Sequence, residues 1–159
     1  SGVEQVVHGD RDGYIYNHDT GNSFIHDGLA ANVSAHYRTP FLDFGDMGTR
    51  KTLQYAKISA TPDANTGGYS QPSLVVKLDY EDVTLLHPPA YLLPEIRGGA
   101  SFGTAIFGSS YFGALENPLI RQTLQGSCYS ANFAIKSDDQ LQPYTINGLY
   151  LNYVPAGRR

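Results

Sequence analysis

The sequence predicts an all-β protein, an antiparallel, jelly-roll-like β-sandwich with long irregular loops and an N-terminal hairpin. Apolar and polar residues alternate along several short segments, as they do on strands with one buried face. Stretches rich in glycine and proline separate these segments, and the chain holds 17 glycines and 9 prolines among its 159 residues. Seven or more short strands with such connections are typical of a sandwich.

The chain starts with a predicted hairpin, in which residues 5–8 and 14–17 flank Gly9-Asp10-Arg11-Asp12-Gly13. Carboxylates two residues apart could offer oxygen ligands to calcium. The EF-hand pattern fails, however, because Tyr14 occupies its fifth position. We interpret the segment as a polar turn. Residues 1–30 are then an N-terminal hairpin unit, and residues 31–159 form the sandwich domain.

Two longer segments are predicted to carry irregular strands. In residues 52–60 the apolar phase shifts near Tyr55, which indicates a β-bulge. In residues 144–154 it shifts at Asn147-Gly148. That segment is either one bulged strand or a tight hairpin, because Asn-Gly favours the positive φ of a hairpin turn.

Three further segments complete the predicted sandwich. Residues 73–81 alternate, with Leu74, Val76, Leu78 and Tyr80 on one face, and residues 131–136 repeat the pattern. Residues 117–126 have helix-capping residues but also a strand pattern, and we favour a strand over 119–125 because the neighbouring elements are strands. Residues 62–71 and 88–99 are expected to be exposed, irregular loops.

Composition excludes several classes of protein. Hydrophobic residues make up 41% and charged residues 16% of the chain, so it can bury a core and is not a charge-driven disordered region. The net charge of −4 does not favour capture of nucleic-acid phosphates. No apolar stretch approaches the roughly 20 residues of a membrane span. We expect no specific nucleic-acid binding and no membrane span.

Metal and nucleophile chemistry has little support. The single cysteine, Cys128, excludes an intrachain disulfide framework and a thiolate zinc site, and we interpret it as a small buried residue. The histidines share no metal-ligand spacing; they are His8, His18, His26, His36 and His87. Neither a serine-nucleophile elbow nor a phosphate-binding loop is present. We therefore expect no metal and no cofactor.

Carboxylate pairs are the remaining candidates for catalysis. Asp43 and Asp46 form one pair, and residues 79–82 hold another group. Glycosidases use two carboxylates roughly 5–10 Å apart, but carboxylates are also common at turns and on solvated strand faces. We expect no catalytic residues and no enzymatic activity, and a hydrolase that uses Asp43 and Asp46 ranks last among the alternatives.

A short aromatic repeat is the most unusual local feature. Phe102, Phe107 and Phe112 recur every five residues, each followed by glycine. Five matches neither the strand nor the helix period, so we predict an irregular segment whose phenylalanines dock in pockets. These pockets belong either to the same domain or to a neighbouring subunit. The C-terminal pair Arg158-Arg159 is either a solvated tail or a docking site for an acidic partner.

The sequence resembles the C-terminal region of tail nozzle and tail hub proteins of short-tailed bacteriophages. The resemblance lies in residues 8–16 (HGDRDGYIY), 37–46 (YRTPFLDFGD) and 50–53 (RKTL), the Phe-Gly repeat, and residues 147–159 (NGLYLNYVPAGRR). It covers most of residues 8–55 and 100–159 and includes no catalytic signature.

The resemblance implies a non-enzymatic structural protein of the virion, assembled in the host cytoplasm. Such proteins form rings, typically hexamers, around the DNA exit channel and contact adaptor, fibre or spike proteins. An upstream β-propeller would precede this domain, and residues 9–19 would close its last blade. The implied contact residues are Phe102, Phe107, Phe112, Arg158 and Arg159.

A carbohydrate-binding β-sandwich is the main alternative. The chain has 12 tyrosines and no tryptophan, and tyrosine offers a large contact area at low entropic cost. Alternation places Tyr55, Tyr80 and Tyr150 on apolar faces, so we expect core packing to account for them. Tyr69 and Tyr91 lie in predicted loops and are the candidates for glycan contact.

Overall fold

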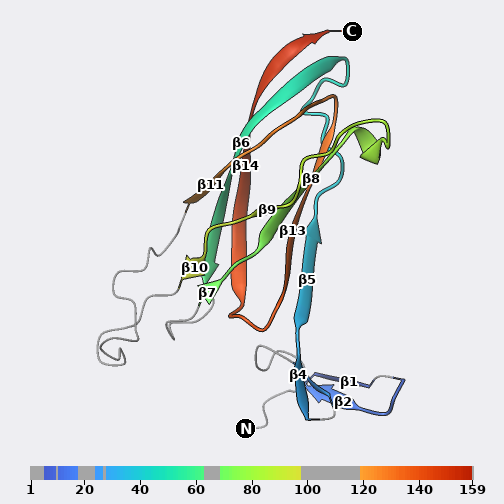
Figure 1. Ribbon diagram of the computed structural model, residues 1–159, viewed down its shortest axis with the longest axis vertical. Coiled ribbons are helices and arrows are strands. Elements are labelled where there is room, and N and C mark those ends of the chain that lie inside the picture. The colour runs from blue at the N-terminus through green and yellow to red at the C-terminus, as the bar shows by residue number, and fades with distance from the viewer. Residues whose placement is uncertain are drawn as a thin grey trace.

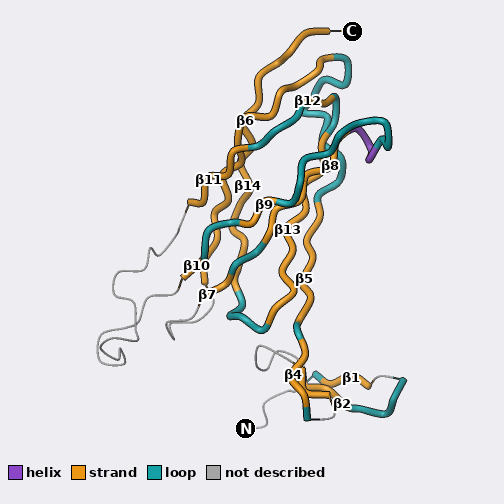
Figure 2. Tube along the Cα trace, in the orientation of Figure 1, coloured by secondary structure: helices purple, strands orange, loops and turns teal. Residues whose placement is uncertain are grey.

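The computed structural model describes residues 6–9, 11–17, 24–26, 28–62, 69–97 and 119–158. Within them the regular structure is β-strand apart from one 3₁₀ turn, and every strand pairing is antiparallel. The prediction of an all-β, sandwich-like fold is confirmed, while the jelly-roll form stays a prediction. Figures 1 and 2 show the elongated body, with small hairpins at one end.

One layer is built around β6 (Thr49–Pro62), the central strand of its sheet. β14 (Tyr144–Arg158) pairs along one edge of β6 for almost its whole length. The other edge is shared by β11 (Leu119–Thr123) and β12 (Ser127–Cys128). We call this layer the β6 sheet. Residues 119–123 are thus a strand rather than a helix, as predicted.

The second layer has the strand order β5–β13–β8–β9, and we call it the β13 sheet. β5 (Val33–Arg38) and β8 (Ser73–Leu78) flank β13 (Ala131–Asp139), and β9 (Tyr91–Leu92) lies at the outer edge of β8. A separate two-stranded pairing joins β7 (Tyr69–Ser70) to β10 (Ile96–Arg97). Beyond β8 the chain forms a 3₁₀ turn, η1 (Asp79–Glu81).

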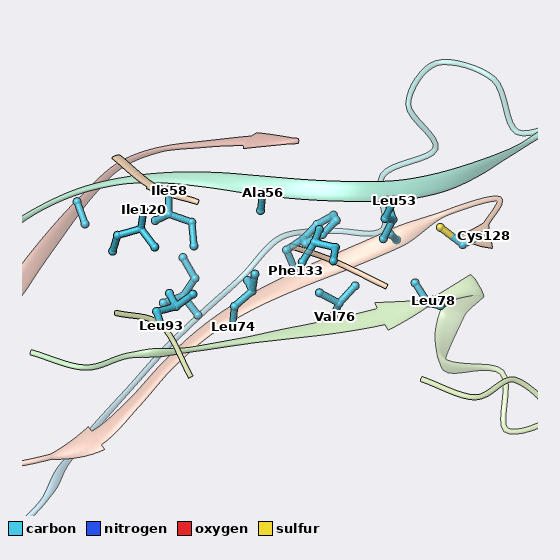
Figure 3. Packing of buried hydrophobic residues seen from close by; sticks show 14 of the residues in the cluster. Leu53, Ala56, Ile58, Leu74, Val76, Leu78, Leu93, Ile120, Cys128 and Phe133 are labelled. Carbon is cyan, nitrogen blue, oxygen red and sulfur yellow. The ribbon is translucent and has the colours of Figure 1, made fainter. Parts of the chain in front are cut away.

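Apolar side chains of the two layers meet in one core (Figure 3). The β6 sheet contributes Leu53, Ala56, Ile58 and Ile120, and the β13 sheet contributes Leu74, Val76, Leu78 and Phe133. Full burial of each large side chain stabilises the fold by about 1.5–3 kcal/mol. The period-two alternation that predicted these strands therefore also selected their buried faces.

Both predicted strand irregularities are present. Asn152 pairs with Tyr55 and Tyr153 with Leu53, which leaves Gln54 as the extra residue of a bulge next to Tyr55. The Gln54 carbonyl instead accepts a 2.9 Å hydrogen bond from the backbone N–H of Leu124. A second register shift leaves Asn147 unpaired between Ile146 and Gly148. Of the two interpretations of residues 144–154, the single bulged strand is the correct one.

The N-terminal hairpin is also confirmed. β1 (Val7–Gly9) pairs with β2 (Ile15–Asn17), and the turn between them includes Gly13 at φ +89°. A second small hairpin joins β3 (Phe24–His26) to β4 (Leu29–Ala31), which leads into β5 through Asn32. The division between residues 1–30 and 31–159 stays a prediction.

Three sequence-based expectations are wrong in detail. Residues 88–97 are not an exposed loop, because they include β9 and β10 and bury Leu93 and Ile96 in the core. Tyr80 does not continue the apolar face of β8, since the chain turns there with φ +59° and leaves its side chain exposed. Asn132, on the face of β13 that the alternation predicts to be polar, is buried, and its amide is hydrogen-bonded to Arg38 and to the Thr39 carbonyl.

Candidate interaction surfaces

The carboxylate pairs singled out in the sequence hold turns together. The Asp43 carboxylate accepts a hydrogen bond from the Gly45 N–H. The Asp46 carboxylate accepts bonds from the Gly48 N–H and from the hydroxyl of Thr49. These are local turn contacts of the kind short acidic side chains make. They give the pair a structural role and offer no support for a hydrolase.

The second carboxylate group fixes a protruding loop. The Glu81 carboxylate pairs with the Arg38 guanidinium, and this bond holds the pKa of Glu81 below its ordinary value. Asp82 accepts bonds from the backbone N–H and the hydroxyl of Thr84, which lower its pKa in the same way. Asp79 accepts two backbone N–H groups of the β12–β13 connection. No cluster of potential metal ligands occurs in the described ranges.

We call residues 79–87 the η1 loop; Figures 1 and 2 show it projecting from the end of β8. Three consecutive non-glycine residues, Asp79, Tyr80 and Glu81, have positive φ. Such strain persists only where surrounding contacts enforce it. His87 contributes by accepting the Leu78 N–H through Nδ1, and the Tyr80 ring stacks on Phe41. Between the anchored residues Glu81 and His87, the side chains of Val83 and Leu86 are 96% and 95% exposed.

The outer side of the β6 sheet presents a second surface. Its central residues from three adjacent strands are Leu119, Arg121, Thr123, Tyr55, Lys57, Ser59, Gly148, Tyr150 and Asn152. We call this set the Tyr150 face. Six of these residues line a shallow hollow of about 530 Å³: Tyr55, Lys57, Ser59, Leu119, Tyr150 and Asn152.

The Tyr150 face combines cations with aromatic rings. The guanidinium of Arg121 lies 4.3 Å and the ammonium of Lys57 lies 5.7 Å from the centre of the Tyr55 ring. Both cations are therefore held by cation–π contacts. Tyr150 is 63% exposed, and Tyr55 lies on the same outer face, so the expectation that these two tyrosines pack in the core is wrong. The face has no carboxylate, although acidic residues outnumber basic ones in the chain by 15 to 11.

The small hairpins carry a third surface of exposed apolar side chains. Ile15 of β2 is 79% exposed, and Leu29 of β4 is 74% exposed; the others are Val6, Val7 and Ile25. Two-stranded hairpins are at best marginally stable alone in water. Exposed apolar side chains at one end of the molecule make the small hairpins a candidate contact surface.

A groove is lined by residues of β5, β13 and β14. Its volume is about 360 Å³, and its lining includes Val33, Tyr37, Ile135 and Ile146. Within the described parts of the chain, no strand pairs with the outer edge of β5. This edge carries unpaired backbone groups, which are a site for further strand pairing.

The remaining predicted sites have mixed outcomes. Phe102, Phe107, Phe112, Asp10, His18 and Arg159 lie outside the described residues. The backbone of Arg158 pairs with Thr49.

The two tyrosines proposed for glycan contact lie in strands. Tyr91 is not an exposed loop residue: it is half-buried against the core, and its hydroxyl accepts the Gln125 N–H. Tyr69 lies in β7, with the guanidinium of Arg97 5.3 Å from its ring centre. Sequence reasoning missed Val83 and Leu86, since apolar residues in a short loop carry no periodic signal.

Cys128 is fully buried, as predicted. Burial, together with the nearby Asp79 charge, raises the pKa of its thiol to about 11. A thiol that stays protonated at neutral pH is a poor nucleophile.

Comparison with known proteins gives no relative: no family model matches the chain, and neither a curated protein nor a solved structure matches it significantly. The chain is therefore classed by its fold alone, as an all-β protein of two packed antiparallel sheets. None of its described helices is long and apolar enough to cross a membrane.

Proposed function

We propose that this chain is a structural component of a phage tail, a nozzle or hub protein that works through contacts between subunits and with adaptor, fibre or spike proteins. The observation that carries the assembly role is the set of exposed apolar side chains on the two small hairpins, led by Ile15 and Leu29. The resemblance of residues 8–16 and 37–46 to tail nozzle and hub proteins supports the tail as the place of assembly.

The described carboxylates agree with a role without chemistry. Asp43, Asp46, Asp79 and Asp82 each accept hydrogen bonds that hold a turn, and Glu81 is paired with Arg38. A structural protein of the virion acts through its surfaces, and the candidate surfaces of this chain are the η1 loop, the Tyr150 face, the small hairpins and the groove beside β5. The proposed assembly is a homo-oligomeric ring that lies around the DNA exit channel.

Immunogold electron microscopy of phage particles tests this proposal. Antibody raised against the chain is expected to label the tail vertex of intact particles from a lysate that also gives a positive blot. A positive blot with unlabelled particles would contradict the proposal.

Substitution in the Phe-Gly repeat is a second test. We expect assembly to be impaired more than folding in each of three variants, Phe102→Ser, Phe107→Ser and Phe112→Ser. Equal loss of stability in all three would count against a contact role.

Carbohydrate binding is the second candidate, and the hollow beside Tyr150 favours it. This face offers an exposed ring, two cations and the Asn152 amide, whereas the Tyr91 hydroxyl is already engaged. Binding on a glycan array that is lost in Tyr150→Ala but kept in Tyr69→Ala would support this function. Absence of binding to any glycan would exclude it.

A further inference from the structure

We propose that the η1 loop of one copy of this chain docks, head to tail, on the Tyr150 face of a second copy. The proposal names a contact for the homo-oligomer of the proposed function and depends on that self-assembly, but not on the phage tail as its location.

The loop has the properties of a preorganised docking element. Val83 and Leu86 are almost fully exposed, at 96% and 95%. Their backbone is fixed by the Asp79 bonds to β12–β13, the Arg38–Glu81 pair and the His87 bond to Leu78. A segment already ordered before binding loses little conformational entropy when it docks. Docking on another protein would bury the exposed side chains of Val83 and Leu86.

The Tyr150 face offers room and suitable chemistry for the loop. Its hollow of about 530 Å³ falls within the range of about 300–1,000 Å³ that binding pockets occupy, so two aliphatic side chains fit. The exposed side chains of Tyr150 and Leu119 provide apolar contact area. Tyrosine and arginine are also the residue types most often found at the energetic centre of interfaces.

Charge favours the same pairing. The face carries Lys57 and Arg121 without a carboxylate, whereas Asp82 lies directly beside Val83 in the loop. The charge excess of the loop is modest, because Arg38 offsets Glu81, and Arg50 lines a hollow with Asp79 and Asp82. Apolar contact would therefore provide most of the affinity, and the charges would set orientation and association rate.

The two surfaces belong to opposite sheets of one chain, so the proposed contact joins different patches of two copies. The η1 loop extends from β8 in the β13 sheet, while the Tyr150 face is the outer side of the opposite sheet (Figures 1 and 2). A contact between two different patches is heterologous, and repetition of such a contact produces a ring or a filament. A ring is the assembly that the proposed function requires.

Disulfide crosslinking of the 159-residue chain tests the contact. A mixture of Val83→Cys and Tyr150→Cys proteins is oxidised under mild conditions; the native Cys128 is buried and does not interfere. We expect a crosslinked dimer from this mixture. A mixture of Val83→Cys with Thr145→Cys should give little dimer, because Thr145 is exposed at the start of β14, away from Tyr150. No dimer in the first mixture, or equal yields in both, would overturn the proposal.

Sedimentation velocity provides a second readout. Leu86→Ser and Tyr150→Ser are each expected to weaken self-association by about tenfold or more. Lys57→Glu should weaken it most at low salt, where charges are least screened. Unfolding curves show whether each variant folds. Self-association unchanged by all three, or strong binding of an acidic glycan to this face instead, would overturn the contact.

The immunogold result keeps the two proposals apart. Tail labelling without the specific crosslink leaves the proposed function and removes this contact. The specific crosslink without tail labelling does the reverse.

Discussion

Asp79 and Ser130 exchange hydrogen bonds between two parts of the chain. The Asp79 backbone N–H donates to the Ser130 carbonyl at 2.9 Å, and the Asp79 carboxylate accepts the Ser130 N–H at 2.9 Å. The same carboxylate accepts the Tyr129 N–H at 2.8 Å. This exchange joins the start of the η1 loop to the turn before β13, and so holds the loop in its positive-φ conformation.

Removal of the Asp79 carboxylate should loosen this junction. We expect Asp79→Ala to lower the free energy of unfolding by about 1–3 kcal/mol, because two part-buried N–H groups lose their acceptor. Asp79→Asn keeps one acceptor oxygen and should lose less. Urea unfolding of both variants measures the difference. Equal stability of Asp79→Ala and the wild type would show that the bonds do not hold the loop.

Lys51 is a buried cation that the sequence did not single out. Only 2% of its surface is exposed, and its ammonium donates to the carbonyls of Asp46 and Tyr129. Lys51→Met leaves both carbonyls without this donor and should cost about 1–3 kcal/mol of unfolding free energy. Lys57→Met, on the outer sheet face, is the matched control and should change stability little. Similar unfolding midpoints for the two variants would contradict this role.

The Arg38–Glu81 pair should make the loop sensitive to acid. Glu81 has a pKa below its ordinary value of 4.5, because its carboxylate accepts a hydrogen bond from Arg38. A lowered pKa in the folded state adds stability that is complete above the ordinary value and lost as pH falls through the lowered one. We expect wild type to exceed Glu81→Gln in stability at pH 6, and the gap to close as pH falls below the ordinary value. A gap independent of pH would refute this ion-pair contribution.

Cys128 should be chemically silent in the folded protein. Its thiol is fully buried and its pKa is raised to about 11, so very little thiolate forms at pH 8. An aromatic disulfide reagent should label one thiol per chain after denaturation and react very slowly before it. Rapid labelling of the folded protein would show that this part of the core opens easily.

Periodicity was enough to predict the main core strands. The alternation in residues 73–78 and 131–135 identified two core strands, and phase shifts near Tyr55 and at Asn147 identified two bulges. These patterns work because a strand with one buried face must place an apolar residue at every second position. Burial of Leu93 and Ile96 could not be predicted in this way, because β9 and β10 are too short to show a period.

The candidate surfaces were harder to predict. Tyr150 fits the period-two alternation of β14. The side of the strand that faces the core, however, is set by the bulge at Asn147 and by the pairing with β6. The exposure of Val83 and Leu86 depends on tertiary contacts of Asp79 and Arg38, which pair residues distant in sequence. A single sequence shows each of these residues but does not show which distant residue it contacts.

We propose that the exposed apolar side chains of the small hairpins hold this chain in a phage tail, and incorporation into particles is the decisive test. Tails are assembled with the wild-type chain or with the Ile15→Ser, Leu29→Ser double variant. The amount of this chain in the purified particles is then measured with the antibody. Both substituted residues are exposed, so the variant should unfold at the same urea concentration as wild type. We expect wild-type protein in the particles and little or none of the variant. Equal incorporation of both, or particles that lack the wild-type chain, would contradict it.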